Sequence, residues 1–154
     1  MQKWFSAHPN YVEAGDRVRH WDYDLECYVT LEVKKVCTKT FLVLKYDKKM
    51  DKYRSVYIPH DKLGMVPREV TNTSDTPNLL QNISMAWNKL AEKSEDSGYF
   101  TNRAGFYFIY NKKLWFLYAP GYREGHYLPY VDTIRQNLLA IGATSVVFDE
   151  GDLD

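Results

Sequence analysis

The segment Tyr28-Val29-Thr30-Leu31-Glu32-Val33-Lys34-Lys35-Val36 decides the fold class of the N-terminal half. Apolar residues at 29, 31 and 33 alternate with polar residues at 30, 32 and 34. Because successive side chains of an extended strand point to opposite faces, this alternation predicts a strand with one buried face. The neighbouring sequence continues in the same way, with short strands separated by turn residues.

Residues 16–70 predict a series of short strands rather than helices. The connection between the third and fourth strands, residues 47–52, is charged, as hairpin loops often are. In chain order, the predicted elements are a strand from Gly15-Asp16 to Trp21, an acidic loop at 22–26, strands at 28–36, 40–46 and 53–58, one helical turn at 59–64 and a short strand at 65–66 before Pro67.

This half opens with Gly15-Asp16-Arg17-Val18, a Gly-Asp-x-Val motif. Together with the long acidic first loop, three meandering strands, a single turn and a short fifth strand, the layout over residues 14–68 resembles the SH3-like β-barrels. That class includes KOW, Tudor and true SH3 domains. The Ala-Leu-Tyr-Asp-Tyr signature of peptide-binding SH3 domains is missing, so the resemblance does not imply binding of proline-rich ligands.

The C-terminal half has a different pattern. Residues 69–77 are polar and rich in turn formers, which predicts a linker. Beyond it, the periodicity of apolar residues indicates, in order, a helix from 78 to about 93, a hairpin of strands 106–110 and 114–118 that is apolar on both faces, a helix from 129 to 141 ended by Gly142, a strand at 143–148 and a frayed acidic tail at 149–154.

The predicted fold is therefore α+β. It consists of an SH3-like β-barrel at residues 1–68, a linker at 69–77 and an α-β-β-α-β domain at 78–154. Gly105-Phe106-Tyr107-Phe108-Ile109 partly imitates the base-stacking strands of RNA-recognition folds. Since basic neighbours are lacking, we expect these aromatic residues to pack in the core.

Charge and cysteine content exclude several partners and compartments. Twenty Lys and Arg balance twenty Asp and Glu, so no global field attracts nucleic acid or anionic lipid, and any such binding must be local. No apolar run approaches the ~20 residues of a membrane span, and no export signal is visible. Cys27 and Cys37 flank one predicted strand, roughly 30 Å apart and too far for a disulfide. We expect a cytoplasmic protein without membrane contact.

Motifs of the common enzyme classes are absent. The sequence has no Walker loop, GxGxxG, GxSxG, HExxH or CxxC. The hairpin at 106–117 has no carboxylate with which a nuclease core would bind a metal. The four histidines are far apart in the sequence, and we expect surface or capping roles for them. We therefore expect no catalytic residue, no metal site and no cofactor.

The first candidate binding segment is His20-Trp21-Asp22-Tyr23-Asp24. Alternation places the two rings, Trp21 and Tyr23, on one face and His20 with the two carboxylates on the other. Rings and carboxylates both attract cations, so the segment predicts contact with a basic segment of a protein partner. The polar aromatic loop that follows Gly121 predicts a second set of recognition residues, Tyr122, Arg123, His126 and Tyr127.

The second candidate is the charged hairpin around residues 45–54. Basic side chains interleaved with tyrosines bind phosphates and stack bases, which favours nucleic acid as the ligand. The residues concerned are Lys45, Tyr46, Lys48, Lys49, Lys52, Tyr53 and Arg54. In the alternative interpretation, this is an ordinary hairpin tip in which Asp47 and Asp51 pair with the basic residues.

Three functions remain open at this stage. The first is a non-catalytic binding protein that engages a protein partner through aromatic loops; its compact, tyrosine-rich sequence is similar in character to bacteriophage accessory proteins that inhibit host enzymes. The second is nucleic-acid binding by the hairpin at 45–54. The third is a hydrolase or phosphate-handling enzyme, whose site would combine His126, Arg123 and Glu124 with Asp22 or Asp24 across the two halves.

Overall fold

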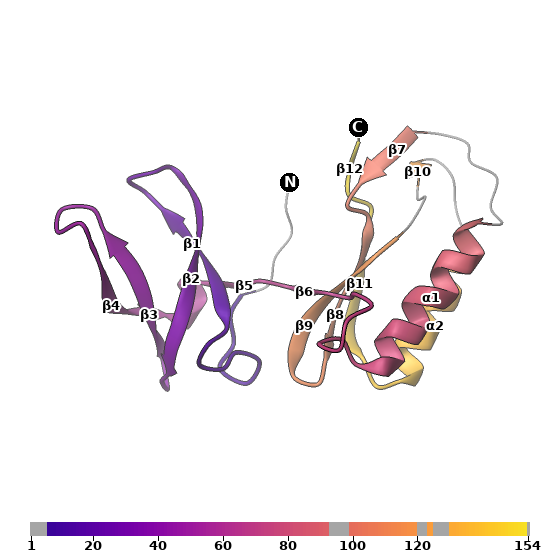
Figure 1. The fold of residues 1–154 in the computed structure, drawn as a ribbon, viewed down its shortest axis with the longest axis horizontal. Helices are drawn as coiled ribbons and strands as arrows, with labels where there is room; N and C mark the ends of the chain where they lie inside the picture. Colours follow the sequence, from indigo (N-terminus) through magenta and orange to yellow (C-terminus); the bar gives the residue numbers. More distant parts are fainter. Residues whose placement is uncertain (1–5, 93–98, 120–122, 125–129, 154) are drawn as a thin grey trace. The chain divides into compact units, whose positions relative to one another are not determined.

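The computed structural model describes residues 6–92, 99–119, 123–124 and 130–153, and it shows a small α+β protein (Figure 1). The chain divides into two compact units, Gln2–Val66 and Pro67–Asp154. The division lies just before the segment 69–77 that the sequence analysis expects to be a linker. Each unit is described separately below.

The N-terminal unit contains a five-stranded antiparallel sheet with the strand order β4-β3-β2-β1-β5. These bounds agree with the expected strands to within one or two residues. The elements are β1 Arg17–Asp22, β2 Cys27–Val36, β3 Thr40–Asp47, β4 Lys52–Pro59, a 3-10 turn η1 at His60–Lys62, and β5 Gly64–Met65. Cys27 and Cys37, expected to be unpaired with each other, are both free thiols.

The alternation that predicted β2 determines what this sheet buries. Leu31 and Val33 are buried, whereas Thr30 and Lys34 on the other face are exposed. Strand pairing places Val18 of β1 opposite Leu31 and Val43 of β3 opposite Val33. Directly opposed residues of antiparallel strands share a face, so the buried side chains of three strands meet in one apolar layer.

His60 fixes the turn after β4 to the β2–β3 connection. Its Nε2 lies 3.0 Å from the carbonyl oxygens of both Cys37 and Thr40, and its ring packs 4.3 Å from that of Phe41. A ring nitrogen between two carbonyl acceptors carries the proton and donates it. This histidine therefore has the capping role that the sequence analysis expects.

The C-terminal unit is a four-stranded sheet, in the order β11-β8-β9-β6, with α1 and α2 lying side by side over one face (Figure 1). A smaller sheet has the order β10-β7-β12. The elements are β6 Arg68–Glu69, α1 Asn78–Glu92, β7 Tyr99–Asn102, β8 Gly105–Tyr110, β9 Lys113–Tyr118, β10 Arg123–Glu124, α2 Tyr130–Ala140, β11 Thr144–Asp149 and β12 Asp152–Leu153.

Aromatic side chains dominate the core of this unit. Trp87 of α1 and Phe106 of β8 lie 5.5 Å apart, and both are fully buried together with Phe108. Ile134 and Leu138 bring α2 into the same cluster. The expectation that the Gly105–Ile109 segment packs in the core is confirmed, because its aromatic residues are buried. These rings are therefore not available to stack on bases.

Three details differ from the sequence analysis. Residues 69 and 70 of the expected linker are not free, because β6 pairs in parallel with β9 and the Val70 amide donates to the Phe116 carbonyl at 3.0 Å. The prediction of a frayed tail is wrong at Asp152–Leu153, because this segment pairs with β7. Leu79, one of the apolar residues whose spacing predicts the first helix, is 48% exposed rather than buried. Two-residue strands carry too little periodicity to be recognised in advance.

The β8–β9 hairpin turns through two residues with positive φ, Asn111 at 51° and Lys112 at 62°. This is the type I′ geometry that suits the right-handed twist of a hairpin. Asn tolerates the left-handed region, whereas a lysine there carries a steric cost of roughly 1–2 kcal/mol between its Cβ and the backbone.

We predict that Lys112→Gly stabilises the protein by about 1 kcal/mol, because glycine removes that steric cost and completes an Asn-Gly turn. The measurement is the free energy of unfolding from urea denaturation followed by tryptophan fluorescence. Lys113→Gly, one residue into β9, serves as the control and is expected to destabilise. A Lys112→Gly variant less stable than the parent would contradict the turn assignment.

Candidate functional site

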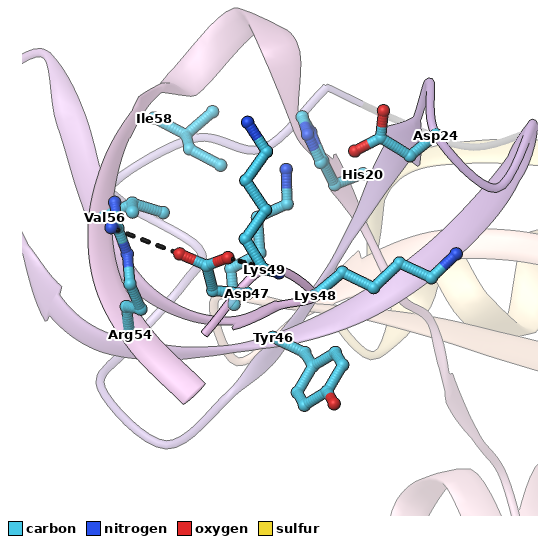
Figure 2. Close-up of a pocket in the computed structure, with 10 residues that line it drawn as sticks. His20, Asp24, Tyr46, Asp47, Lys48, Lys49, Arg54, Val56 and Ile58 are labelled. Carbon is cyan, nitrogen blue, oxygen red and sulfur yellow. Dashed lines mark hydrogen bonds and ion pairs between the residues drawn. The ribbon is translucent and has the colours of Figure 1, made fainter. Parts of the chain in front are cut away.

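The loops of the two hairpins β1–β2 and β3–β4 lie at the same end of the N-terminal sheet (Figure 1). A hollow of about 410 Å³ opens at this end (Figure 2). We call it the basic mouth. It is lined by His20, Asp24, Lys45, Tyr46, Asp47, Lys48, Lys49, Arg54, Val56 and Ile58.

The register of β3 against β4 explains how this hollow forms. Phe41 pairs with Ile58, Val43 with Val56, and Lys45 with Arg54. Since opposed residues share a face, Lys45 and Arg54 stand on the face that buries Phe41 and Val43 further along the strands. The basic mouth is thus the polar end of the same face that forms the apolar core.

Positive charge is in excess around the basic mouth. Its lining has four Lys or Arg side chains against two Asp, which gives 4 − 2 = +2. Arg54 pairs with Asp47 at 3.2 Å, and Asp47 also accepts the amide of Lys49 at 3.0 Å. No ion pair holds Lys48 or Lys49 within the described part of the chain. Both lysines line the hollow and are exposed (Figure 2).

The alternative interpretation, in which Asp47 and Asp51 pair with the basic residues of the hairpin, therefore holds for Arg54 among the described ion pairs. Asp51, its other expected acid, accepts the hydroxyl of Tyr46 instead, and this hydrogen bond raises the pKa of Tyr46. Lys52, the remaining basic residue of the predicted group, is exposed at the start of β4 and does not line the hollow.

Two tyrosines stand beside the basic mouth. Tyr46 and Tyr53 face each other across β3 and β4 with ring centroids 5.4 Å apart, and they are 44% and 66% exposed. They line a second hollow of about 330 Å³, which adjoins the first because both include Asp24, Lys45, Tyr46 and Lys48. Exposed rings next to lysines offer stacking surface beside positive charge.

His20 lies at the inner side of the basic mouth, next to Asp24 (Figure 2). Its Nδ1 is buried and has no hydrogen-bond partner. Burial, and secondly the charge of Lys45, lower the pKa of His20 below its ordinary value of 6.5; the Lys62 carbonyl and the Asp22 carboxylate oppose this. The ring is therefore neutral at pH 7.

Asp22 and Asp24, paired in the sequence analysis as partner contacts, have different surroundings. The Oδ1 of Asp22 accepts the amides of Asp24 at 2.9 Å and Leu25 at 3.1 Å, and the Leu25 bond contributes most to lowering its pKa. This carboxylate shapes the β1–β2 loop. Asp24 lines the basic mouth together with three lysines and Arg54. The rings of Trp21 and Tyr23 do contact each other, with centroids 6.5 Å apart.

The second set of expected partner residues can be placed only in part. Arg123 pairs through its backbone with Phe100 in the β10–β7 ladder. Tyr122, His126 and Tyr127 lie outside the described residues, and so does one member of the catalytic alternative, His126. Among the residues that the structure describes, no group of His, Cys, Asp and Glu could hold a metal ion.

Sequence reasoning missed that His20, Val56 and Ile58 belong to the same hollow as the lysines. The sequence pattern could have indicated only part of this grouping. The alternation in β4 places Arg54, Val56 and Ile58 on one face, but the register that adds His20 depends on the pairing of four strands.

Comparisons with protein-family models, curated proteins and solved structures gave no match. No helix in the described part of the chain is long and apolar enough to cross a membrane.

We predict that the stability of the protein falls as the pH drops below about 6.5, and that His20 causes part of this loss. Because the folded state lowers the pKa of His20, the unfolded state binds the proton more readily, so stability is present above the unfolded pKa and is lost as the pH falls.

The measurement is the urea midpoint between pH 8 and pH 5 for the parent and for His20→Gln, with His8→Gln as the matched control. The His20→Gln curve should be flatter than that of the parent, and the His8→Gln curve should follow the parent. Parallel curves for all three proteins would show that His20 is not held neutral.

Proposed function

We propose that this protein is a non-catalytic binding protein that engages single-stranded nucleic acid at the basic mouth of its N-terminal unit. One observation carries the proposal: Lys45, Lys48 and Lys49 converge on a hollow beside the exposed, mutually packed rings of Tyr46 and Tyr53. Phosphates attract the lysines, and each ring offers a face to a base.

A single strand fits this arrangement better than a duplex. Tyrosine rings stack on bases that are not already stacked and paired, and such contacts are tolerant of sequence. The protein as a whole is uncharged, so the attraction must come from the local excess at the basic mouth. We expect modest affinity with a marked dependence on salt.

We further propose that the N-terminal unit is an SH3-like barrel. The support is the strand order β4-β3-β2-β1-β5, with the last strand beside the first, and the 3-10 turn η1 between β4 and β5. The proposed α-β-β-α-β domain has similar support, since α1, β8, β9, α2 and β11 follow one another in that order apart from the short strands β7 and β10.

We predict that the double variant Lys48→Ala/Lys49→Ala binds a fluorescently labelled oligothymidine about tenfold or more weakly than the parent in low salt. Each lysine that releases a counterion contributes ~0.7 to the slope of log K against log salt, so the slope should fall by about 1.4. Fluorescence anisotropy at several salt concentrations measures both quantities.

Lys34→Ala/Lys35→Ala is the matched control, because it removes two exposed lysines from β2 in the same unit, outside both hollows. It should bind as the parent does. Equal loss in the two double variants would indicate nonspecific attraction, and no binding of oligothymidine by the parent at low salt would refute the proposed function.

A separate prediction concerns the rings. Tyr53→Ala should weaken binding by roughly 1–3 kcal/mol, the usual worth of one base stacked on an aromatic side chain, with the salt slope unchanged. Tyr57→Ala is the matched control, since Tyr57 is on the same strand and 63% exposed but lines neither hollow. Equal effects of the two substitutions would argue against stacking at Tyr53.

A second candidate function, engagement of a protein partner, is favoured by a different observation. The rings of Trp21, Tyr23 and Tyr28 form a cluster with substantial exposed surface. Inhibition of a host or defence enzyme, as by the bacteriophage accessory proteins, would be one form of this function. The chemistry of the cluster is developed next.

A further inference from the structure

A recognition site of another kind lies on the opposite face of β1 from the basic mouth. Trp21 pairs with Tyr28, and their neighbours His20 and Val29 pair in the next position of the β1–β2 ladder. Because side chains alternate between the faces of a strand, Trp21 and Tyr28 stand on the face away from His20. The basic mouth and this second site therefore use neighbouring residues of β1 and share no lining residue.

Two aromatic rings, those of Trp21 and Tyr28, line this second site, and the ring of Tyr23 contacts Trp21 beside it. The Trp21 and Tyr28 rings meet nearly at right angles with centroids 4.9 Å apart, and the Trp21 and Tyr23 rings do so at 6.5 Å. Tyr28 is 49% and Tyr23 84% exposed. Exposed tyrosine and tryptophan rings are enriched at sites that bind partners.

A carboxylate lies in the hollow beside these rings. The hollow has a volume of about 300 Å³, and we call it the aromatic hollow; it is lined by Ser6, Trp21, Tyr28, Asp61, Lys62, Leu63 and Gly64. Asp61 comes from the 3-10 turn η1, far in sequence from the rings.

The backbone holds Asp61 firmly next to Trp21. Arg19 of β1 pairs with Gly64 of β5, and the Ala7 amide donates to the Leu63 carbonyl at 2.8 Å. At the start of the same turn, His60 is bound to two carbonyl oxygens of the β2–β3 connection. Since both ends of η1 are tied to the sheet, the hollow exists before any ligand arrives.

We propose that the aromatic hollow binds an arginine side chain presented by a basic segment of a partner protein. Ring faces attract cations, a planar guanidinium stacks on aromatic surfaces, and its fork of N–H donors matches a carboxylate such as Asp61. An anionic ligand is disfavoured by Asp61. Lys62 lines the same hollow and repels an incoming cation, so it limits the affinity.

This assignment replaces the carboxylates that the sequence suggested for the same task. Asp22 accepts two amides of its own loop, and Asp24 lies among the lysines of the basic mouth. Tyr28 and Asp61, which the sequence analysis did not consider, take their places. The inference does not depend on nucleic-acid binding, because the basic mouth contributes no residue to it.

The test uses the full chain labelled with ¹⁵N and the capped pentapeptides Gly-Gly-Arg-Gly-Gly, Gly-Gly-Lys-Gly-Gly and Gly-Gly-Glu-Gly-Gly. The readout is the indole N–H resonance of Trp21, assigned by its loss in Trp21→Leu. We expect a saturable shift with the arginine peptide at millimolar concentration, a weaker one with lysine, and none with glutamate. Equal shifts with all three peptides, or none with arginine, would overturn the proposal.

Matched variants locate the charge that matters. Asp61→Asn should weaken arginine-peptide binding about three- to fivefold, Lys62→Ala should strengthen it, and Asp24→Asn, which removes the same charge from the basic mouth, should leave it unchanged. Tyr23→Ala, at a side chain too exposed to support the fold, should also weaken binding. Asp24→Asn having the same effect as Asp61→Asn would refute the site.

Oligothymidine binding distinguishes this proposal from the proposed function. Asp61→Asn should bind oligothymidine as the parent does, whereas Lys48→Ala/Lys49→Ala should still bind the arginine peptide. Each site can therefore fail by itself. A loss of both activities in either variant would show that the two faces of β1 do not act separately.

Discussion

The pairing of β2 with β1 on one side and β3 on the other is the constraint on which the N-terminal unit depends. Leu31 and Val33 are buried on one face of the sheet. The register of β2 with β1 and β3 determines on which face each side chain of those strands lies. A slip of one residue would turn Lys45 toward the outer face and Leu44 inward. The burial of Val18, Val33 and Val43 makes that slip costly, and so it fixes Lys45 at the basic mouth.

The sequence predicted the elements of both units well, because each long element has its own period. Alternation in β2 and helical spacing in α1 are properties of contiguous residues, so both can be recognised without knowing which strands or helices pack against them. The strands that were missed, such as β6 and β12, have two residues each. They exist because an edge of a larger sheet offers them hydrogen bonds, and that edge is not visible in a local pattern.

The candidate sites were predicted less completely, for a related reason. The lysines and tyrosines at 45–54 are close in sequence, so their grouping could be recognised, and the structure gathers most of them at one hollow. Asp61 is forty residues from Trp21, and the pairing of β5 with β1 together with the hydrogen bonds of His60 brings them together. Conversely, Asp22 is next to Trp21 in sequence, yet alternation turns it to the other face of the strand.

The same alternation explains how an uncharged chain accommodates the two proposed sites of opposite preference. Residues 20–24 include aromatic, acidic and imidazole side chains. The alternation of β1 places His20 in the hollow that Lys45 lines and Trp21 in the hollow that Asp61 lines. The basic mouth then has an excess of positive charge, and the aromatic hollow has Asp61 beside Lys62, although the sum over the chain is zero. Alternation along one strand therefore keeps the proposed anion-binding hollow and the proposed cation-binding hollow on opposite sides of β1, whereas a loop of the same composition would leave the charges to cancel.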